Sequence, residues 1–304
     1  MKPIISLAIA VAACALAGAA NATTVTGTLT PAYGAPLVVQ TTQTTRDNTS
    51  GPGPVWVASG GELDAGYAYV EGGMLHLFFA GNMMLWLQLE GLITHCEPLD
   101  VFIDSQPGGQ NTLLSNNPAV DYEFDMTTMT GLTFDPGFEP DYVFALTSLY
   151  MPTLTAYRAT LPTGGGGVGT HLGETSLGGP GTLTGGDNSA GIAVTLDDSN
   201  IGGVTQGCGA SSGAGVTTGM EWAIPLSAIG NPTGCIRVCA FLAREHQYSV
   251  LNQVLGPLPP GTCDLAGPGT VNFGAIAGDQ FFSWCPDATP TRTPTWGALK
   301  SRYR

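Results

Sequence analysis

The sequence predicts an all-β fold, an antiparallel jelly-roll β-sandwich with long glycine-rich loops. The clearest strand is 99–104, Leu-Asp-Val-Phe-Ile-Asp, which puts three aliphatic residues on one face and Phe with two aspartates on the other. Glycine (44) and proline (22) are frequent among the 304 residues and resist both helix interiors and central strands. Short strands joined by long loops fit this composition, and a helical bundle does not.

Residues 1–22 have the pattern of a secretory signal peptide. A basic residue follows the first methionine, residues 4–16 are apolar, and Ala20-Asn21-Ala22 forms an Ala-x-Ala cleavage site. A lipoprotein signal ending at Cys14 is the alternative. We expect the mature chain to begin near Thr23 and to be secreted or held at the cell surface. No later run reaches the roughly 18–20 apolar residues of a spanning helix, so we expect no transmembrane anchor in the mature chain.

Charge divides the rest into an acidic body, 23–290, and a short basic tail, 291–304. All 23 acidic residues lie between residues 23 and 291. The basic residues of that span are Arg46, Arg158, Arg237 and Arg244. Such a body argues against nucleic acid or an anionic membrane as a partner, while divalent cations and plain solubility both fit it. We expect 23–290 to form the β-sandwich domain.

Six cysteines remain after the signal peptide, and an even number in an exported chain predicts up to three disulfides. They are Cys96, Cys208, Cys235, Cys239, Cys263 and Cys285. A bond between Cys235 and Cys239 is disfavoured, because four strand residues span roughly 13 Å. Fifteen pairings exist. Among them we expect Cys208–Cys235 and Cys263–Cys285, each closing one loop.

The first half of the body predicts paired strands. Thr-rich runs at 25–30 and 37–42 have the composition of edge or paired strands. Residues 62–70 and 74–80, joined through Glu-Gly-Gly, predict a hairpin. Residues 85–89 form a further short apolar run before the 99–104 strand. Residues 132–146 predict a loop feeding a buried strand, and 150–159 its hairpin partner.

The second half alternates strands with loops. Residues 163–191 are rich in glycine and predict a long irregular excursion. Strands are expected at 192–196 and at 219–226, where proline stops the strand and a helical turn follows at 227–230. A core strand is expected at 235–243. The segments 271–273 and 280–284 are expected to close the sandwich.

Five of these stretches, taken in order, resemble a group of exported bacterial proteins with a DOMON-like or family 9 carbohydrate-binding-like jelly roll. They are 63–67 (Leu-Asp-Ala-Gly-Tyr), 101–105 (Val-Phe-Ile-Asp-Ser), 132–143, 221–226 (Glu-Trp-Ala-Ile-Pro-Leu) and 272–280. The resemblance covers roughly residues 25–285, and it implies sugar binding or, as in some DOMON domains, haem binding. The tail 295–304 is similar to short Trp-Gly…Tyr-Arg ends of other exported bacterial proteins.

Catalytic motifs are missing from the sequence. The four histidines form no HExxH pattern, and there is no Gly-x-Ser-x-Gly elbow or P-loop. A glycosidase needs two carboxylates ~5–10 Å apart. Asp100 and Asp104 lie roughly 13 Å apart on one strand face, and Glu221 could approach either from a neighbouring strand. An acidic glycoside hydrolase is therefore the weakest alternative, and we expect no enzyme.

Calcium is the cofactor that the sequence favours. Hard oxygen ligands on turns suit Ca²⁺, although no EF-hand spacing is present. Several Asp, Asn and Glu residues lie in or beside predicted loops, and ordinary turn formation also explains them. Our candidate ligands are Asp104, Asp197 and Asp198.

Sugar binding would use exposed aromatic side chains. Trp56, in the Pro-flanked run 54–57, is the best candidate ligand-binding residue, and Tyr67, Tyr69 and Tyr248 are others. Trp86 and Trp222 alternate with core positions and are expected to be buried. Haem binding would use Met83 or Met84 with a histidine as ligands, whereas Met in such strands is usually part of the core.

Together these features predict an exported, non-catalytic binding module, with an extracellular carbohydrate as its expected partner. The alternative is a structural surface or filament subunit that binds copies of itself. For that alternative the Thr-rich segment 23–42 would pair with a neighbour's sheet edge.

Overall fold

The structure is a computed structural model that describes residues 24–45, 60–85, 88–89, 92–93 and 96–286. Its elements form two antiparallel sheets. The first contains, in spatial order, β1 (Val38–Val39), β2 (Glu62–Glu71), β3 (Met74–Asn82), β12 (Gly219–Pro225) and β11 (Ala193–Leu196). The second contains β10 (Thr184–Gly185), β9 (Gly169–Ser176), β8 (Thr153–Thr160), β7 (Tyr142–Tyr150), β6 (Leu99–Asp104), β13 (Ile236–Ala243) and β14 (Val250–Val254), with β15 (Phe282–Trp284) also on β13.

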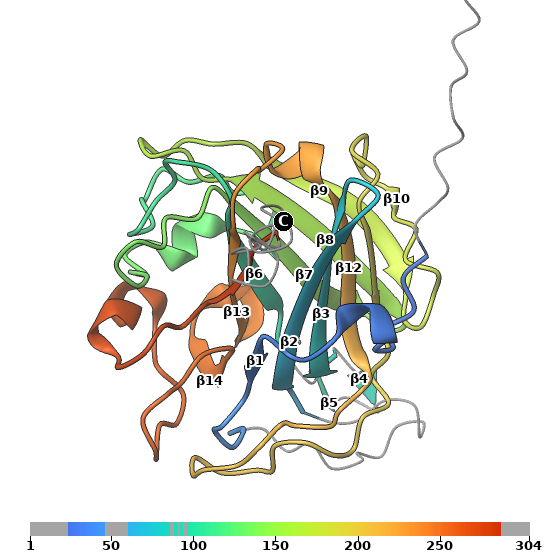
Figure 1. Cartoon of the computed structure of the whole chain (residues 1–304), viewed down its shortest axis with the longest axis vertical. Coiled ribbons are helices and arrows are strands. Elements are labelled where there is room, and N and C mark those ends of the chain that lie inside the picture. Colours follow the sequence, from blue (N-terminus) through green and yellow to red (C-terminus); the bar gives the residue numbers. More distant parts are fainter. Residues whose placement is uncertain (1–23, 46–59, 86–87, 90–91, 94–95, 287–304) are drawn as a thin grey trace, which may run out of the picture.

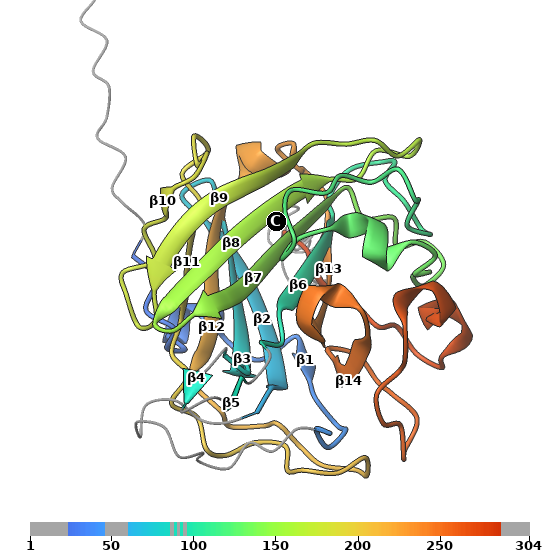
Figure 2. The same ribbon diagram turned by 180° about the vertical axis from the view of Figure 1, so that it is seen from behind.

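The two sheets lie face to face, and β7–β9 run obliquely behind β2, β3 and β12 in Figure 1 and in front of them in Figure 2. A separate pair, β4 (Gln88–Leu89) and β5 (Leu92–Ile93), forms a minimal ribbon. The prediction of an all-β, antiparallel, two-sheet protein is confirmed. The jelly-roll connectivity stays a prediction.

Strand β6 is central, as predicted, and pairs with β7 on one side and β13 on the other. Its aliphatic residues join the core between the sheets, together with Phe79, Phe144 and Trp222. Its other face is buried too, because Phe102 stacks on Phe241 and packs against Phe134 in a second core. Loop residues within 113–138 and 258–276 cover this face. The outer face of β6 is therefore covered by loops and is not exposed to solvent.

The N-terminal segment covers the outer face of the first sheet. Tyr33 packs against Tyr67, Tyr69 and Phe78, and Thr28 forms an isolated antiparallel bridge with Thr218. The predicted strand at 25–30 is thus only a bridge, and the predicted strand at 37–42 shortens to β1. Strand β3 is already paired with β2 on one side and β12 on the other. Residues 25–33 therefore add no strand between them and cover the face of the sheet instead.

The predicted hairpin 62–80 is confirmed as β2 and β3, with Gly72 and Gly73 at positive φ in its turn. The prediction of an irregular excursion over 163–191 is wrong in part, because β9 and β10 lie inside it. Glycine is required there. Gly173 has a φ of 126°, and an added Cβ would lie 2.5 Å from the carbonyl oxygen of Thr184. The sequence analysis also missed β14.

The expected disulfides are wrong in their pairing. The structure contains Cys208–Cys263 and Cys235–Cys285. Register explains the second bond: Ile236 on β13 is paired with Trp284 on β15, so the next residues outward, Cys235 and Cys285, face each other. Cys96 and Cys239 are buried and form no disulfide. Burial raises the pKa of the Cys239 thiol well above its ordinary value, which keeps it unreactive.

The first disulfide joins two loops that the chain 42–45 already holds together. Thr42 and Thr44 bridge to Ala210 and Gln206, respectively, and the Thr45 hydroxyl donates to Asp264. Cys208 and Cys263 lie in these loops. The sequence did not predict the Cys208–Cys263 pairing, because residues 42–45, which hold the two loops together, are distant in sequence from both cysteines.

Candidate functional site

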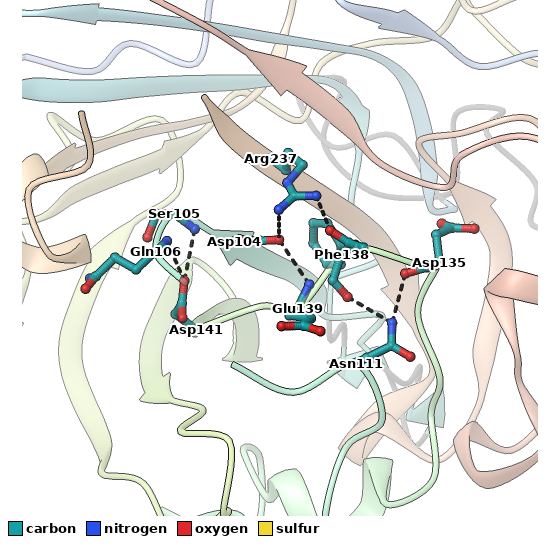
Figure 3. A network of polar contacts seen from close by, with 10 residues as sticks. Asp104, Ser105, Gln106, Asn111, Asp135, Phe138, Glu139, Asp141 and Arg237 are labelled. Atoms are coloured by element: carbon teal, nitrogen blue, oxygen red, sulfur yellow. Dashed lines mark hydrogen bonds and ion pairs between the residues drawn. The ribbon is translucent and has the colours of Figure 1, made fainter. Parts of the chain in front are cut away.

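The carboxylate of Asp104, a predicted calcium ligand, is engaged in a network where β6 ends (Figure 3). Asp104 Oδ2 lies 2.7 Å from an Arg237 guanidinium nitrogen and accepts a hydrogen bond of 3.0 Å from the backbone N–H of Glu139. Burial raises the pKa of Asp104, whereas the Glu139 N–H and Arg237 lower it. The side chain thereby fixes a loop to the sheet.

Two neighbours complete this network. Asp141 Oδ2 accepts from the backbone N–H groups of Ser105 (3.0 Å) and Gln106 (2.9 Å). The Asn111 amide donates to three loop carbonyls, those of Phe134, Asp135 and Phe138. Almost every polar group points at backbone, so the network shapes the loop. A hollow of about 380 Å³ beside it is lined by residues that include Gln106, Asn231 and Arg237.

The predicted pair Asp197 and Asp198 separates in the structure. Asp197 Oδ1 accepts from the N–H of Ser199 as a turn cap. Asp198 is 1% exposed, and its Oδ1 accepts from the N–H of Met83 at 3.0 Å. Asp104 is remote from both. The start of β2 marks the other end of β6: Gly61, the residue before β2, lies against Leu242, and Leu242 pairs with Leu99. Asp104 is at the opposite end of β6 from Leu99.

Asp198 belongs instead to a cluster of oxygen-bearing side chains that sequence reasoning missed, all of them buried except the half-buried Asn200. We call this the oxygen cluster, and its members are Glu62, Asp64, Asn82, Asp198 and Asn200. Glu62 and Asn82 are cross-strand partners on β2 and β3, and Asp64 also lies on β2. The loop after β11 brings in Asp198 and Asn200. Burial raises the pKa of Asp64 to about 7, with the Val204 N–H and Glu62 acting in the opposite direction. Burial also raises the pKa of Asp198.

A third group consists of surface aromatic residues where the connection between β6 and β7 meets the β13–β14 turn. Tyr122 is 68% exposed and Tyr248 is 54% exposed. The ring of His246 packs against both, with its centroid 3.7 Å from that of Tyr122 and 5.5 Å from that of Tyr248. His246 Nδ1 donates to the carbonyl oxygen of Tyr122 at 3.0 Å and lies 3.6 Å from Glu123 Oε1. We call this the tyrosine platform.

The turn that carries the platform has an unusual backbone. His246 and Gln247 both have positive φ, 53° and 60°. Such a conformation costs roughly 1–2 kcal/mol for each non-glycine residue. Gln247 is fully buried and donates to Asp100 at 2.8 Å, which holds the turn in this form. Strained backbone that the surroundings enforce is concentrated at functional sites.

The other sequence candidates are placed as follows. Trp56 and Trp86 lie outside the described residues. Trp222 is buried, as expected, and Tyr67 is buried as well. Met83 packs in the core between the sheets. Tyr248 is the one sugar-binding candidate among the described residues that the structure leaves largely exposed.

The carboxylates proposed for a hydrolase do not meet. Glu221 lies on β12 in the first sheet, whereas Asp100 and Asp104 lie on β6 in the second. Glu221 accepts hydrogen bonds from the N–H groups of Thr26 and Gly27 and from the Tyr33 hydroxyl. Its carboxylate therefore holds the N-terminal segment.

Within the part of the chain that the structure describes, no three His, Cys, Asp or Glu side chains already surround a metal position. Over the same residues no helix is long and apolar enough to cross a membrane. No family model, no curated protein and no solved structure matches the chain.

Proposed function

We propose that this chain is an exported, non-catalytic binding module whose tyrosine platform binds carbohydrate. The observation that carries the proposal is the pair of exposed rings, Tyr122 and Tyr248, on two loops that meet at His246. Two disulfides fit a protein of an oxidising, extracellular compartment.

The platform has the chemistry that sugar recognition uses. Apolar faces of pyranose rings stack on aromatic side chains, and tyrosine combines a large apolar surface with a polar hydroxyl. Glu123 is buried and its Oε1 lies 3.6 Å from His246 Nδ1, so its carboxylate supports the platform from within. Large exposed apolar side chains that gather in one place indicate a binding surface.

The platform is also held in a fixed position. Asp121 accepts from the N–H groups of Glu123 and Phe124 and from the Tyr157 hydroxyl, which anchors the loop that carries Tyr122. Gln247 anchors the turn that carries Tyr248. A preformed surface loses little conformational entropy on binding, which suits the weak, shallow contacts of polysaccharide recognition.

The test is affinity electrophoresis and calorimetry against cellulose, xylan, chitin and mannan. Tyr122→Ala and Tyr248→Ala should each weaken binding at least tenfold, because each removes one stacking surface. Ile201→Ala is the matched control, since Ile201 is 73% exposed and lies on another loop. A wild-type chain that binds none of these polysaccharides, or tyrosine variants that bind as well as the wild type, would overturn the proposal.

A further inference from the structure

The oxygen cluster contains more hydrogen-bond acceptors than its donors can serve. Asn200 Nδ2 is surrounded by three oxygens: Glu62 Oε1 at 2.6 Å, the Gly202 carbonyl at 2.7 Å and Asp64 Oδ2 at 3.2 Å. An amide nitrogen carries two hydrogens, so three acceptors cannot all be satisfied by it. The point that Nδ2 occupies is an oxygen-lined position.

Two further oxygens in the cluster are buried without a partner. They are Asn82 Oδ1 and Asp198 Oδ2, on residues that are 0% and 1% exposed. Asn82 Nδ2 faces Glu62 Oε1 at 3.4 Å and the Asn200 carbonyl at 2.8 Å. The charge of Glu62 acts on Asp198. An unpartnered buried acceptor costs about 1–3 kcal/mol, so both atoms demand a donor or a cation.

Within the described part of the chain, no basic side chain contacts Asp64 or Asp198. The partners of Asp64 are the Val204 N–H, Glu62 and Asn200, and Asp198 has the Met83 N–H. Buried carboxylates are stable only when they are paired, protonated or bound to a metal.

The chain approaches this cluster too closely for any residue but glycine. Gly203 has a φ of 102°, and a Cβ there would lie 2.0 Å from Asp64 Oδ1. This close approach lets the backbone N–H of Val204 donate to Asp64 Oδ1 at 2.8 Å.

We propose that the oxygen cluster binds one Ca²⁺ ion. The ion takes the position of Asn200 Nδ2, where Glu62, Asp64 and the carbonyl of Gly202 are its ligands. The Asn82 amide turns over to present Oδ1 in place of Nδ2, and Asp198 Oδ2 completes the ligand set. The Asn200 amide turns aside, which explains why no three acidic side chains already surround an ion. Carboxylate, amide and carbonyl oxygens in an irregular loop suit Ca²⁺, whereas Mg²⁺ demands a near-octahedral shell and retains several waters.

The experiment uses the mature chain after treatment with a chelator. Thermal unfolding and calorimetry are measured at constant ionic strength with CaCl₂ up to about 10 mM, and MgCl₂ serves for comparison. Extracellular modules bind Ca²⁺ with dissociation constants of about 10⁻⁴–10⁻³ M. At 10 mM, which is about 10–100 times that constant, the midpoint should rise by about 3–10 °C. Calorimetry should give one ion per chain and weaker binding of Mg²⁺.

Variants locate the ion. Asp198→Asn and Asp64→Asn should lose the Ca²⁺-dependent shift, whereas Asp187→Asn, which removes a carboxylate that caps an exposed turn, should keep it. A wild-type chain without heat or midpoint shift would overturn the proposal, whatever the variants do. A shift retained by both cluster variants would overturn it as well. Tyr122→Ala should retain full Ca²⁺ binding, so the two proposals fail separately.

Discussion

Gln247 Nε2 donates a hydrogen bond of 2.8 Å to Asp100 Oδ1, while the other two oxygens of the pair, Asp100 Oδ2 and Gln247 Oε1, are buried without a partner. A proton on Asp100 Oδ2 would make that atom a donor, and Gln247 Oε1 would be its acceptor. Burial raises the pKa of Asp100 to about 8, and the Gln247 hydrogen bond lowers it. Asp100 is therefore protonated in the folded protein at neutral pH.

This pair predicts how stability depends on pH. The unfolded carboxyl loses its proton near pH 3.9 and the folded one near pH 8. The contribution of Asp100 to the free energy of unfolding is complete below about pH 3.9 and is lost as the pH rises through about 8. The free energy of unfolding should fall by a few kcal/mol between pH 4 and 8, at up to about 1.4 kcal/mol per pH unit.

The measurement is urea unfolding at pH 5 and pH 8. Asp100→Asn supplies an uncharged donor next to Gln247, so this variant should vary less with pH and exceed the wild type at pH 8. Asp187→Asn, in an exposed turn, should keep the wild-type dependence. Equal pH dependence in the wild type and Asp100→Asn would contradict the prediction.

Arg237 and Asp104 occupy paired positions on β13 and β6, and their side chains form the ion pair at the loop network. Arg237→Met should destabilise the protein by about 1–2 kcal/mol, because it leaves a buried carboxylate without its cation while the arginine itself is partly exposed. Without Arg237 the pKa of Asp104 should rise further.

A double-mutant cycle with Asp104→Asn checks this by urea unfolding. The double variant should lose less stability than the two single variants together, because the carboxylate no longer needs a partner. Additive losses would show that the ion pair does not stabilise the loop.

The disulfide pairing predicts which peptides stay linked after proteolytic digestion. Digestion without reduction should yield the linked pairs Cys208–Cys263 and Cys235–Cys285, and Cys96 and Cys239 should react with thiol reagents only after unfolding. Replacing Cys235 and Cys285 together by alanine should cost about 2–4 kcal/mol, since the bond closes a long loop. Linked peptides in any other pairing would contradict the β13–β15 register.

We expect Glu221 to stabilise the N-terminal segment 24–33 against the first sheet. Glu221→Gln should weaken the hydrogen bonds from Thr26, Gly27 and Tyr33, at a cost of about 1–2 kcal/mol, because charged acceptors bind more strongly than neutral ones. Limited proteolysis should then cleave residues 24–33 first. Tyr33→Phe, which removes one of the donors, should show a smaller effect. Unchanged cleavage in Glu221→Gln would mean that packing alone holds the segment.

The local pattern of the sequence determined much of the fold. Alternation over 99–104 predicted a central strand with an aliphatic inner face, and the Glu-Gly-Gly turn predicted the β2–β3 hairpin, because both signals are contained within a few neighbouring residues. Strand β9 was missed because its glycines argue against a strand when taken alone. Gly173 is required by the close approach of β10.

The candidate site depended on tertiary structure. Asp198 was identifiable as an acidic loop residue, but Glu62, Asp64 and Asn82 read as ordinary members of a hairpin. Only the crossing of the β11–β12 loop over the end of that hairpin brings these oxygens together. Tyr122 was not a candidate in the sequence analysis, because its contact with His246 depends on how two distant loops meet.

The sequence by itself determined the strand periodicity, the acidic body and the residue types available for chemistry, since these are properties of near neighbours. Tertiary structure alone decided the cysteine pairing, the burial of both faces of β6 and the convergence of the oxygen cluster. Those features rest on contacts between residues tens to hundreds of positions apart, such as Asp64 with Asn200, and packing selects among the many pairings that a linear pattern allows.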